Sequence, residues 1–243
     1  MTSFQTVLAR AEQRKSGAEK LQALLPPKHD AAAPAALSDE RVLAEMAKRI
    51  FSAGFAWSVI ETKWSGFEAA FLGFVPGLLT LQPNEFWDGL LSNKRIVRKG
   101  AKIMAVRANA FFVAEIAREH GSFGKFLAKW PSSEQAGLLD LLAKRGTRLG
   151  GNTGPMLLRF LGYDGFTLSK DVIACLRDAG VDIHEAVKSK RDLAKMQAQF
   201  NAWAKETGLG YAQLSKICAL SVGENYTPEE PHARMGVALA LAL

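Results

Sequence analysis

The sequence predicts an all-α protein, because three observations agree. Apolar residues recur every three or four positions along most of the chain, which is the period of a helix with one buried face. Alternation with a period of two, which is typical of strands, is almost absent. Glycine and proline stand between the apolar segments, where helices end. With 243 residues and 48% hydrophobic content, the chain can bury a core in one or two domains.

The first elements follow from local signals. Residues 1–24 favour a helix, which Pro26 and Pro27 terminate, and the Ala/Pro-rich stretch 28–36 is typical of a linker. Ser38 provides an N-cap for the next helix, with acidic residues directly after it. Another helix begins near Phe55 and ends at the Gly/Pro segment 73–76.

Helix follows helix along the rest of the chain. The favoured segments are 86–91, 101–119, 123–129, 134–145, 155–160, 170–178, 190–208 and 211–220. We therefore expect an N-terminal helix and linker at 1–37, a helical core at 38–187 with a hairpin at 144–155, and C-terminal helices at 188–243 that pack on the core.

Composition restricts the classes of partner. A formal charge of +7 and a pI near 9.5 favour a polyanion or an anionic membrane surface. No apolar run approaches the roughly 20 residues that span a bilayer, and the N-terminus lacks the features of a signal peptide. We expect a cytoplasmic monomer that does not bind membranes.

Cys175 and Cys218 are far apart, so we expect two buried thiols, with no disulfide framework, metal or cofactor.

A glycine-rich hairpin between two apolar helices is the firmest motif. Its loop runs from Lys144 to Thr153, and Pro155 lies in the first turn of the second helix, where a missing N–H does no harm. Glycines allow a positive φ and a close approach of phosphate to the backbone, and the helix N-terminus attracts anions. An ordinary helix connection is the alternative. The expected DNA contacts of the hairpin are Lys144, Arg145, Gly146, Arg148, Gly150, Gly151 and Thr153.

A second basic segment, residues 94–107, carries six cations and no acid. Arg98, Lys99 and Lys102 are its expected phosphate contacts, and such contacts make binding depend on salt. The alternative is a solvated basic surface.

The order of hairpin, helix, loop and acidic residue resembles the helix-hairpin-helix DNA glycosylase superfamily, which implies an all-α, glycosylase-like helical bundle. In that superfamily the aspartate after the hairpin helix is the catalytic carboxylate, and Asp171 occupies this position. Thr153 stands where bifunctional members have the Schiff-base lysine, which implies a monofunctional enzyme. The alternative for Asp171 is a residue that the helix dipole favours in a first turn.

The first half is similar to the 3-methyladenine DNA glycosylase I family. Residues 53–60, Ala-Gly-Phe-Ala-Trp-Ser-Val-Ile, are similar to its AGLSW segment, and residues 96–103 and 108–110 are similar to its IIRHRGKI and GNA segments. The resemblance spans roughly residues 40–175. It implies that Trp57 stacks on a flipped base, whereas a core tryptophan is the alternative.

Two departures from the family bear on the substrate. The paired Cys and His ligands of the family's zinc site have no counterpart here. The pocket glutamate eight residues before the tryptophan falls at Arg49, whose charge repels cationic alkylpurines. Glu61, one helical turn after Trp57, is a candidate replacement acceptor, and a solvated or ion-paired side chain is its alternative.

Together these residues predict a monofunctional DNA glycosylase of base excision repair that binds double-stranded DNA. We expect it to flip a damaged purine, expected to be alkylated, out of the duplex. Asp171 is then the carboxylate that assists hydrolysis of the N-glycosidic bond. Arg49 motivates a different hypothesis, a non-catalytic helix-hairpin-helix protein that binds DNA structures. A helical protein-interaction module is a third, and it predicts no affinity for DNA at low salt.

Overall fold

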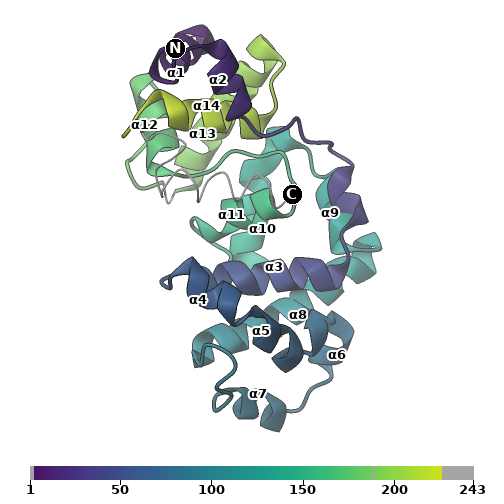
Figure 1. The fold of residues 1–243 in the computed structure, drawn as a ribbon. Coiled ribbons are helices and arrows are strands. Elements are labelled where there is room, and N and C mark those ends of the chain that lie inside the picture. The colour runs from purple at the N-terminus through teal and green to yellow at the C-terminus, as the bar shows by residue number, and fades with distance from the viewer. Residues whose placement is uncertain (1–2, 188, 226–243) are drawn as a thin grey trace. The chain divides into compact units, whose positions relative to one another are not determined.

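The computed structural model describes residues 3–187 and 189–225, and each regular element in these ranges is helical, which confirms the all-α prediction (Figure 1). The α-helices are α1 Phe4–Arg14, α2 Ala18–Ala23, α3 Asp39–Ser52, α4 Trp57–Thr62, α5 Trp64–Ala70, α6 Pro76–Thr80, α7 Asn84–Leu90, α8 Gly100–His120, α9 Phe123–Lys129, α10 Gln135–Arg145, α11 Thr153–Phe160, α12 Lys170–Asp178, α13 Lys190–Thr207 and α14 Tyr211–Ser221. Short 3₁₀ helices are η1 Ala33–Ala36, η2 Leu72–Phe74 and η3 Ser132–Glu134.

The helices form two compact units. The terminal unit takes its described residues from 1–30, 131–136 and 164–243, and the central unit consists of 31–130 and 137–163. Residues 38–187 were expected to form one core, whereas residues 164–187 group with the described residues near the two ends of the chain. Of the expected C-terminal helices, residues 226–243 lie outside the described residues.

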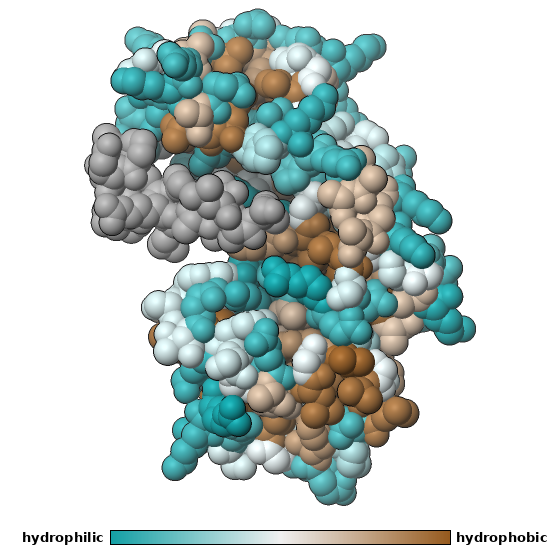
Figure 2. Space-filling view, turned by 45° about the vertical axis from the view of Figure 1, so that its right-hand side comes forward, coloured by the Kyte–Doolittle hydropathy of each residue, from teal (hydrophilic) through white to brown (hydrophobic). Residues whose placement is uncertain are grey.

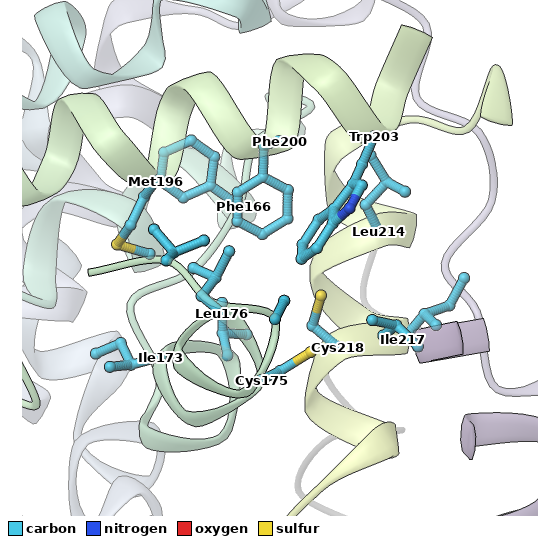
Figure 3. Close-up of a cluster of buried hydrophobic side chains, with 14 of the residues drawn as sticks. Phe166, Ile173, Cys175, Leu176, Met196, Phe200, Trp203, Leu214, Ile217 and Cys218 are labelled. Atoms are coloured by element: carbon cyan, nitrogen blue, oxygen red, sulfur yellow. The ribbon is translucent and has the colours of Figure 1, made fainter. Parts of the chain in front are cut away.

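The core of the terminal unit joins α1, α12, α13 and α14. The rings of Phe166 and Phe200 stack with centroids 4.7 Å apart, and Trp203 meets Phe200 edge to face (Figure 3). Cys175 and Cys218 lie next to each other beneath these rings, fully buried and unbridged (Figure 3). The prediction of two core thiols is therefore confirmed.

The core of the central unit is built on α3 and α8, which pack against each other. Ser38 begins α3 as predicted, because its hydroxyl accepts a hydrogen bond from the Arg41 N–H at 3.3 Å. The apolar face of α3 then meets a cluster of aromatic rings, in which Phe51 contacts Phe67 and Phe71. This packing fixes the end of α3, where the candidate site lies.

Two predicted helices are broken in the structure. In place of the single helix expected over 1–24, the described residues form α1 and α2, because Ser16 and Gly17 between them both have positive φ, 60° and 118°. The helix expected from Phe55 to residue 71 is divided at Lys63 into α4 and α5. The helical spacing of apolar residues continues across this kink, because α4 and α5 each bury apolar residues, so the sequence pattern does not reveal the kink.

The surface of the central unit carries several exposed apolar side chains, and Figure 2 shows hydrophobic surface interrupted by hydrophilic residues. Leu78, Leu81, Met104 and Phe111 are between 44% and 80% exposed. Among the residues that the structure describes, no helix is both long and apolar enough to cross a membrane.

Candidate DNA-binding site

A pocket of about 350 Å³ opens in the central unit, where three segments that are distant in the sequence meet. The end of α3 contributes Ile50, and the residue after this helix, Ala53, lines the pocket as well. The first turn of α8 contributes Lys102. The hairpin contributes Arg148 and Gly150 from its loop and Thr153 from the start of α11. Four residues that the sequence predicts as DNA contacts thus share one pocket.

Lys102 is held in place by backbone carbonyls. Its ammonium group donates to the carbonyl oxygen of Phe51 at 3.1 Å and to that of Ala53 at 2.6 Å. Burial lowers the pKa of Lys102, and the positive charges of Arg148 and Lys99 lower it further. Because an ammonium has three N–H donors, one remains for a ligand in the pocket.

The hairpin consists of α10, the loop 146–152 and α11. Gly146 packs closely in this loop, since a Cβ on it would lie 2.5 Å from the Leu149 side chain. We expected positive φ at Gly146, Gly150 and Gly151, but only Gly151 has it, at 57°. Arg148 takes the second left-handed position at 62°, which costs a residue with a Cβ about 1–2 kcal/mol.

Asn109, a buried residue of α8, clamps the hairpin. Its side-chain carbonyl accepts from the Thr147 N–H at 2.8 Å, and its amide donates to the Thr147 carbonyl at 3.0 Å. The side chain is fully buried, so both bonds are shielded from water. In the sequence, Asn109 stands out only as part of a segment similar to a family motif, and nothing local indicates this structural role.

The backbone N–H groups at the start of α11 are mostly engaged. The Asn152 side chain makes no capping hydrogen bond there, and Pro155 has no N–H. The Thr153 N–H donates to the Gly150 carbonyl at 3.3 Å, and the Met156 N–H donates to a backbone carbonyl at the same distance. The positive end of the helix dipole is what this terminus offers an anion. This end of α11 begins at Thr153, whose hydroxyl side chain lines the pocket.

The cations that were predicted to contact DNA in the hairpin differ in whether they already form ion pairs within the protein. Lys144 pairs with Asp140 at 2.8 Å, and Arg145 pairs with Glu115 at 3.0 Å. No carboxylate of the described residues pairs with Arg148. Arg148 can therefore bind a phosphate without breaking an ion pair among the described residues.

The basic segment before α8 is solvated. Arg98 and Lys99 are exposed, and Lys99 occupies the N-cap position of α8. Arg107, further along α8, is engaged within the protein, because it donates to the Asn84 side chain at 2.9 Å. Only part of the predicted basic segment is thus free for phosphate.

Arg49 and Trp57 meet in an aromatic cluster that includes a residue the sequence analysis did not single out, Phe160. The rings of Trp57 and Phe160 are nearly parallel, with centroids 6.0 Å apart. The guanidinium carbon of Arg49 lies 4.2 Å from the Trp57 centroid and 3.6 Å from the Phe160 centroid. Trp57 is half-buried, so this cluster is reachable from the surface.

Arg49 is charged although it is buried. Burial lowers its pKa to about 10, while the charges of Glu45 and Glu61 raise it. Its Nη2 lies 3.5 Å from a Glu45 carboxylate oxygen, and the other oxygen of Glu45 is bound by Arg41 at 3.1 Å. With a pKa near 10, the guanidinium carries its positive charge at neutral pH.

Glu61 forms an ion pair with Lys48, whose ammonium nitrogen is 2.7 Å from its carboxylate. The same ammonium lies 5.3 Å from the Trp57 ring centroid and 4.9 Å from that of Trp64. The ion-paired alternative for Glu61 therefore describes the structure, in which Lys48 pairs with one oxygen of the carboxylate.

Asp171 lies in the first turn of α12, in the terminal unit. Ser169 caps this helix by accepting from the Val172 N–H at 3.3 Å, as the sequence predicts. The Asp171 carboxylate is exposed, and a Cβ on Gly223 would come within 2.6 Å of it. Its predicted role beside a flipped nucleotide stays a prediction.

The lining of the pocket decides what it can bind. Two cations, a hydroxyl and a glycine backbone face it, and no carboxylate is among its lining residues.

Residues 28–138 match the methyladenine glycosylase family. This match covers a little under half of the chain and confirms the resemblance to the 3-methyladenine DNA glycosylase I family. It ends at residue 138, within α10 and before the hairpin loop and Asp171, so it is shorter than the resemblance expected from the motifs.

Solved structures of 3-methyladenine DNA glycosylase I are also similar to this chain. One from Staphylococcus aureus, solved for 3-methyladenine recognition, is 23% identical with a TM-score of 0.46, over 52% of this chain and 77% of that one. A glutamate-to-glutamine mutant of the enzyme from Staphylococcus aureus is 22% identical, with a TM-score of 0.45, over 52% and 78%. Another structure is 22% identical with a TM-score of 0.44, over 58% and 81%.

Proposed function

We propose that this protein is a monofunctional DNA glycosylase that releases a damaged purine from double-stranded DNA. The observation that carries the proposal is the cationic pocket, because it joins Lys102 of the family-like segment to Arg148 and Thr153 of the hairpin. A phosphate beside the pocket meets two cations, Lys102 and Arg148, and the positive end of the α11 dipole. The pocket therefore fits the backbone of a DNA strand.

Base release requires a carboxylate near the sugar. As the N-glycosidic bond breaks, positive charge develops on the deoxyribose, the base leaves with the bonding electrons, and water adds to C1′. We assign the stabilising carboxylate to Asp171, whose side chain is exposed and unpaired among the described residues. Thr153 has no amine, so no Schiff base forms and the strand stays intact.

The test uses the purified full chain and DNA that has been methylated, deaminated or oxidised. We expect release of a modified base, measured by chromatography, and no covalent complex after borohydride treatment. Asp171→Asn should abolish release but leave DNA affinity within about twofold, because phosphate binding does not need that carboxylate. The control is Asp178→Asn, which removes an exposed carboxylate from the last turn of the same helix. If no modified base is released, the enzyme proposal fails.

One observation favours a second function, a non-catalytic protein that binds DNA structures. The guanidinium of Arg49 already lies against both Trp57 and Phe160, on the surface where a flipped base would stack. For this function we expect salt-dependent affinity for duplex and abasic DNA with no base release, and no effect of Asp171→Asn. The same assays therefore separate the two functions.

A further inference from the structure

Cys175 of α12 and Cys218 of α14 form a pair of thiols that the proposed function does not use. Both side chains are fully buried where α12 packs against α14, and they lie side by side (Figure 3). Both are free thiols, and Cys218 donates a hydrogen bond to the Cys175 sulfur. The two sulfur atoms are therefore in direct contact, which is the first requirement for a disulfide.

The Cys175 sulfur also has polar neighbours. A thiol in purely apolar surroundings has a raised pKa and is inert. Cys175 differs, because a guanidinium nitrogen of Arg10 lies 3.9 Å from its sulfur and the Ser221 hydroxyl lies 3.5 Å from it. The same guanidinium reaches the carboxylate of Asp178 at 3.2 Å, and both of these side chains are more than one third exposed. The sulfur thus lies one guanidinium group beneath the surface, within reach of a small molecule when Arg10 moves.

These neighbours make Cys175 the more reactive of the two thiols. The pKa of Cys175 is lowered to about 7, chiefly by the hydrogen bond from Cys218 and also by Ser221 and Arg10, against the effect of burial. Burial raises the pKa of Cys218 well above its usual value. The thiolate is the nucleophilic form of cysteine. Cys175 is therefore suited to attack an oxidant, and Cys218 remains beside it as a protonated thiol.

We propose that Cys175 and Cys218 are a redox-sensitive pair, in which a peroxide oxidises Cys175 and Cys218 then closes a reversible disulfide between α12 and α14. The Cys175 thiolate attacks one oxygen of hydrogen peroxide, the O–O bond breaks, and the sulfur becomes a sulfenic acid. The departing hydroxide takes up the proton that Cys175 released.

The second step closes the bond. The Cys218 sulfur attacks the Cys175 sulfur, the S–O bond breaks, and the hydroxide leaves with the Cys218 proton as water. Hydrogen peroxide gains the two electrons that the two thiols lose, so no other oxidant is required.

The experiment uses the purified full chain, whose only two cysteines are this pair. After treatment with hydrogen peroxide, the remaining thiols are alkylated in denaturant and the chain is measured by mass spectrometry. We expect an intramolecular disulfide between Cys175 and Cys218 that dithiothreitol removes. Its rate of formation should rise with pH through a midpoint near 7, because the thiolate is the form that reacts. In urea, circular dichroism should show the oxidised chain to be at least as stable as the reduced one.

Variants assign the role of each group. Cys218→Ser should leave Cys175 as a sulfenic acid, which dimedone traps, whereas Cys175→Ser should leave Cys218 reduced. Arg10→Gln should move the pH midpoint of oxidation upward, because one of the groups that favour the thiolate is lost. The matched control is Asp178→Asn, which removes the exposed ion pair of Arg10 but keeps the guanidinium at the sulfur. This control should not move the midpoint upward.

The decisive result comes from the wild type and does not require any variant to fold. The inference is overturned if the chain keeps both thiols under peroxide that oxidises a short cysteine peptide in the same solution, or if disulfides form only between chains. It is also overturned if oxidation begins at Cys218, or if the oxidised chain unfolds at lower urea than the reduced one. Base release is not measured, so this inference and the proposed function can fail separately.

Discussion

Asn109→Ala is expected to loosen the hairpin of the central unit. The substitution removes two hydrogen bonds to the Thr147 backbone, at 2.8 Å and 3.0 Å. Each contributes about 0.5–1.5 kcal/mol, and the lost side chain was fully buried, so a small cavity adds to the cost. The expected loss in the free energy of unfolding is about 2–4 kcal/mol.

Urea unfolding followed by tryptophan fluorescence measures this loss. Of the five tryptophans, Trp57, Trp64, Trp87 and Trp130 belong to the central unit, so the signal reports mainly on the unit that carries the hairpin. The control is Asn152→Ala, because Asn152 is exposed in the same hairpin and its side chain does not cap α11. We expect this control to change stability by less than about 0.5 kcal/mol.

DNA binding gives a second measurement of the same substitution. Asn109→Ala should weaken affinity for duplex DNA, since the backbone of the hairpin at Thr147 is no longer held by a side chain of α8. The slope of log affinity against log salt should stay the same, because no cation has been removed. The reasoning is refuted if Asn109→Ala is as stable as Asn152→Ala, or if it lowers the salt slope as the removal of a phosphate-binding arginine would.

Three other substitutions in the hairpin and pocket have expected outcomes. Gly146→Ala should cost about 1–3 kcal/mol in urea unfolding, because its Cβ would lie 2.5 Å from Leu149, whereas Gly150→Ala, 3.5 Å from its neighbour, should cost little. Arg148→Gly should change stability by less than about 1 kcal/mol, because it relieves a φ of 62°, yet lower the salt slope of DNA binding by about one. DNA affinity should fall as the pH rises through the lowered pKa of Lys102, since only its charged form binds phosphate, and Lys102→Arg should abolish this fall in a titration of affinity against pH.

The sequence predicted the helices well where their signals are local. The N-caps Ser38 and Ser169 each accept the expected backbone hydrogen bond, and the long helix α8 follows from its apolar spacing. The division of one expected helix at Lys63 left no such signal, because the buried face continues through it. Local patterns therefore specify where helices start more clearly than where they kink.

The candidate site was less predictable, because its contacts are between distant residues. Lys102 was expected as a phosphate contact, but its ammonium also binds two carbonyls at the end of α3. Arg145 was expected on the DNA surface, but it pairs with Glu115 of α8. Phe160 was visible only as an apolar residue, since its contact with Arg49 depends on how α11 and α3 pack.

The family match stops before the hairpin loop, but the structure joins the matched segment to that loop. The match ends at residue 138, yet Asn109 within it holds Thr147 beyond it, and Lys102 within it shares a pocket with Arg148 beyond it. Because Asn109 holds the loop beside the pocket, Lys102 and Arg148 come together through the packing of α8 against the hairpin, so neither segment alone predicts the site.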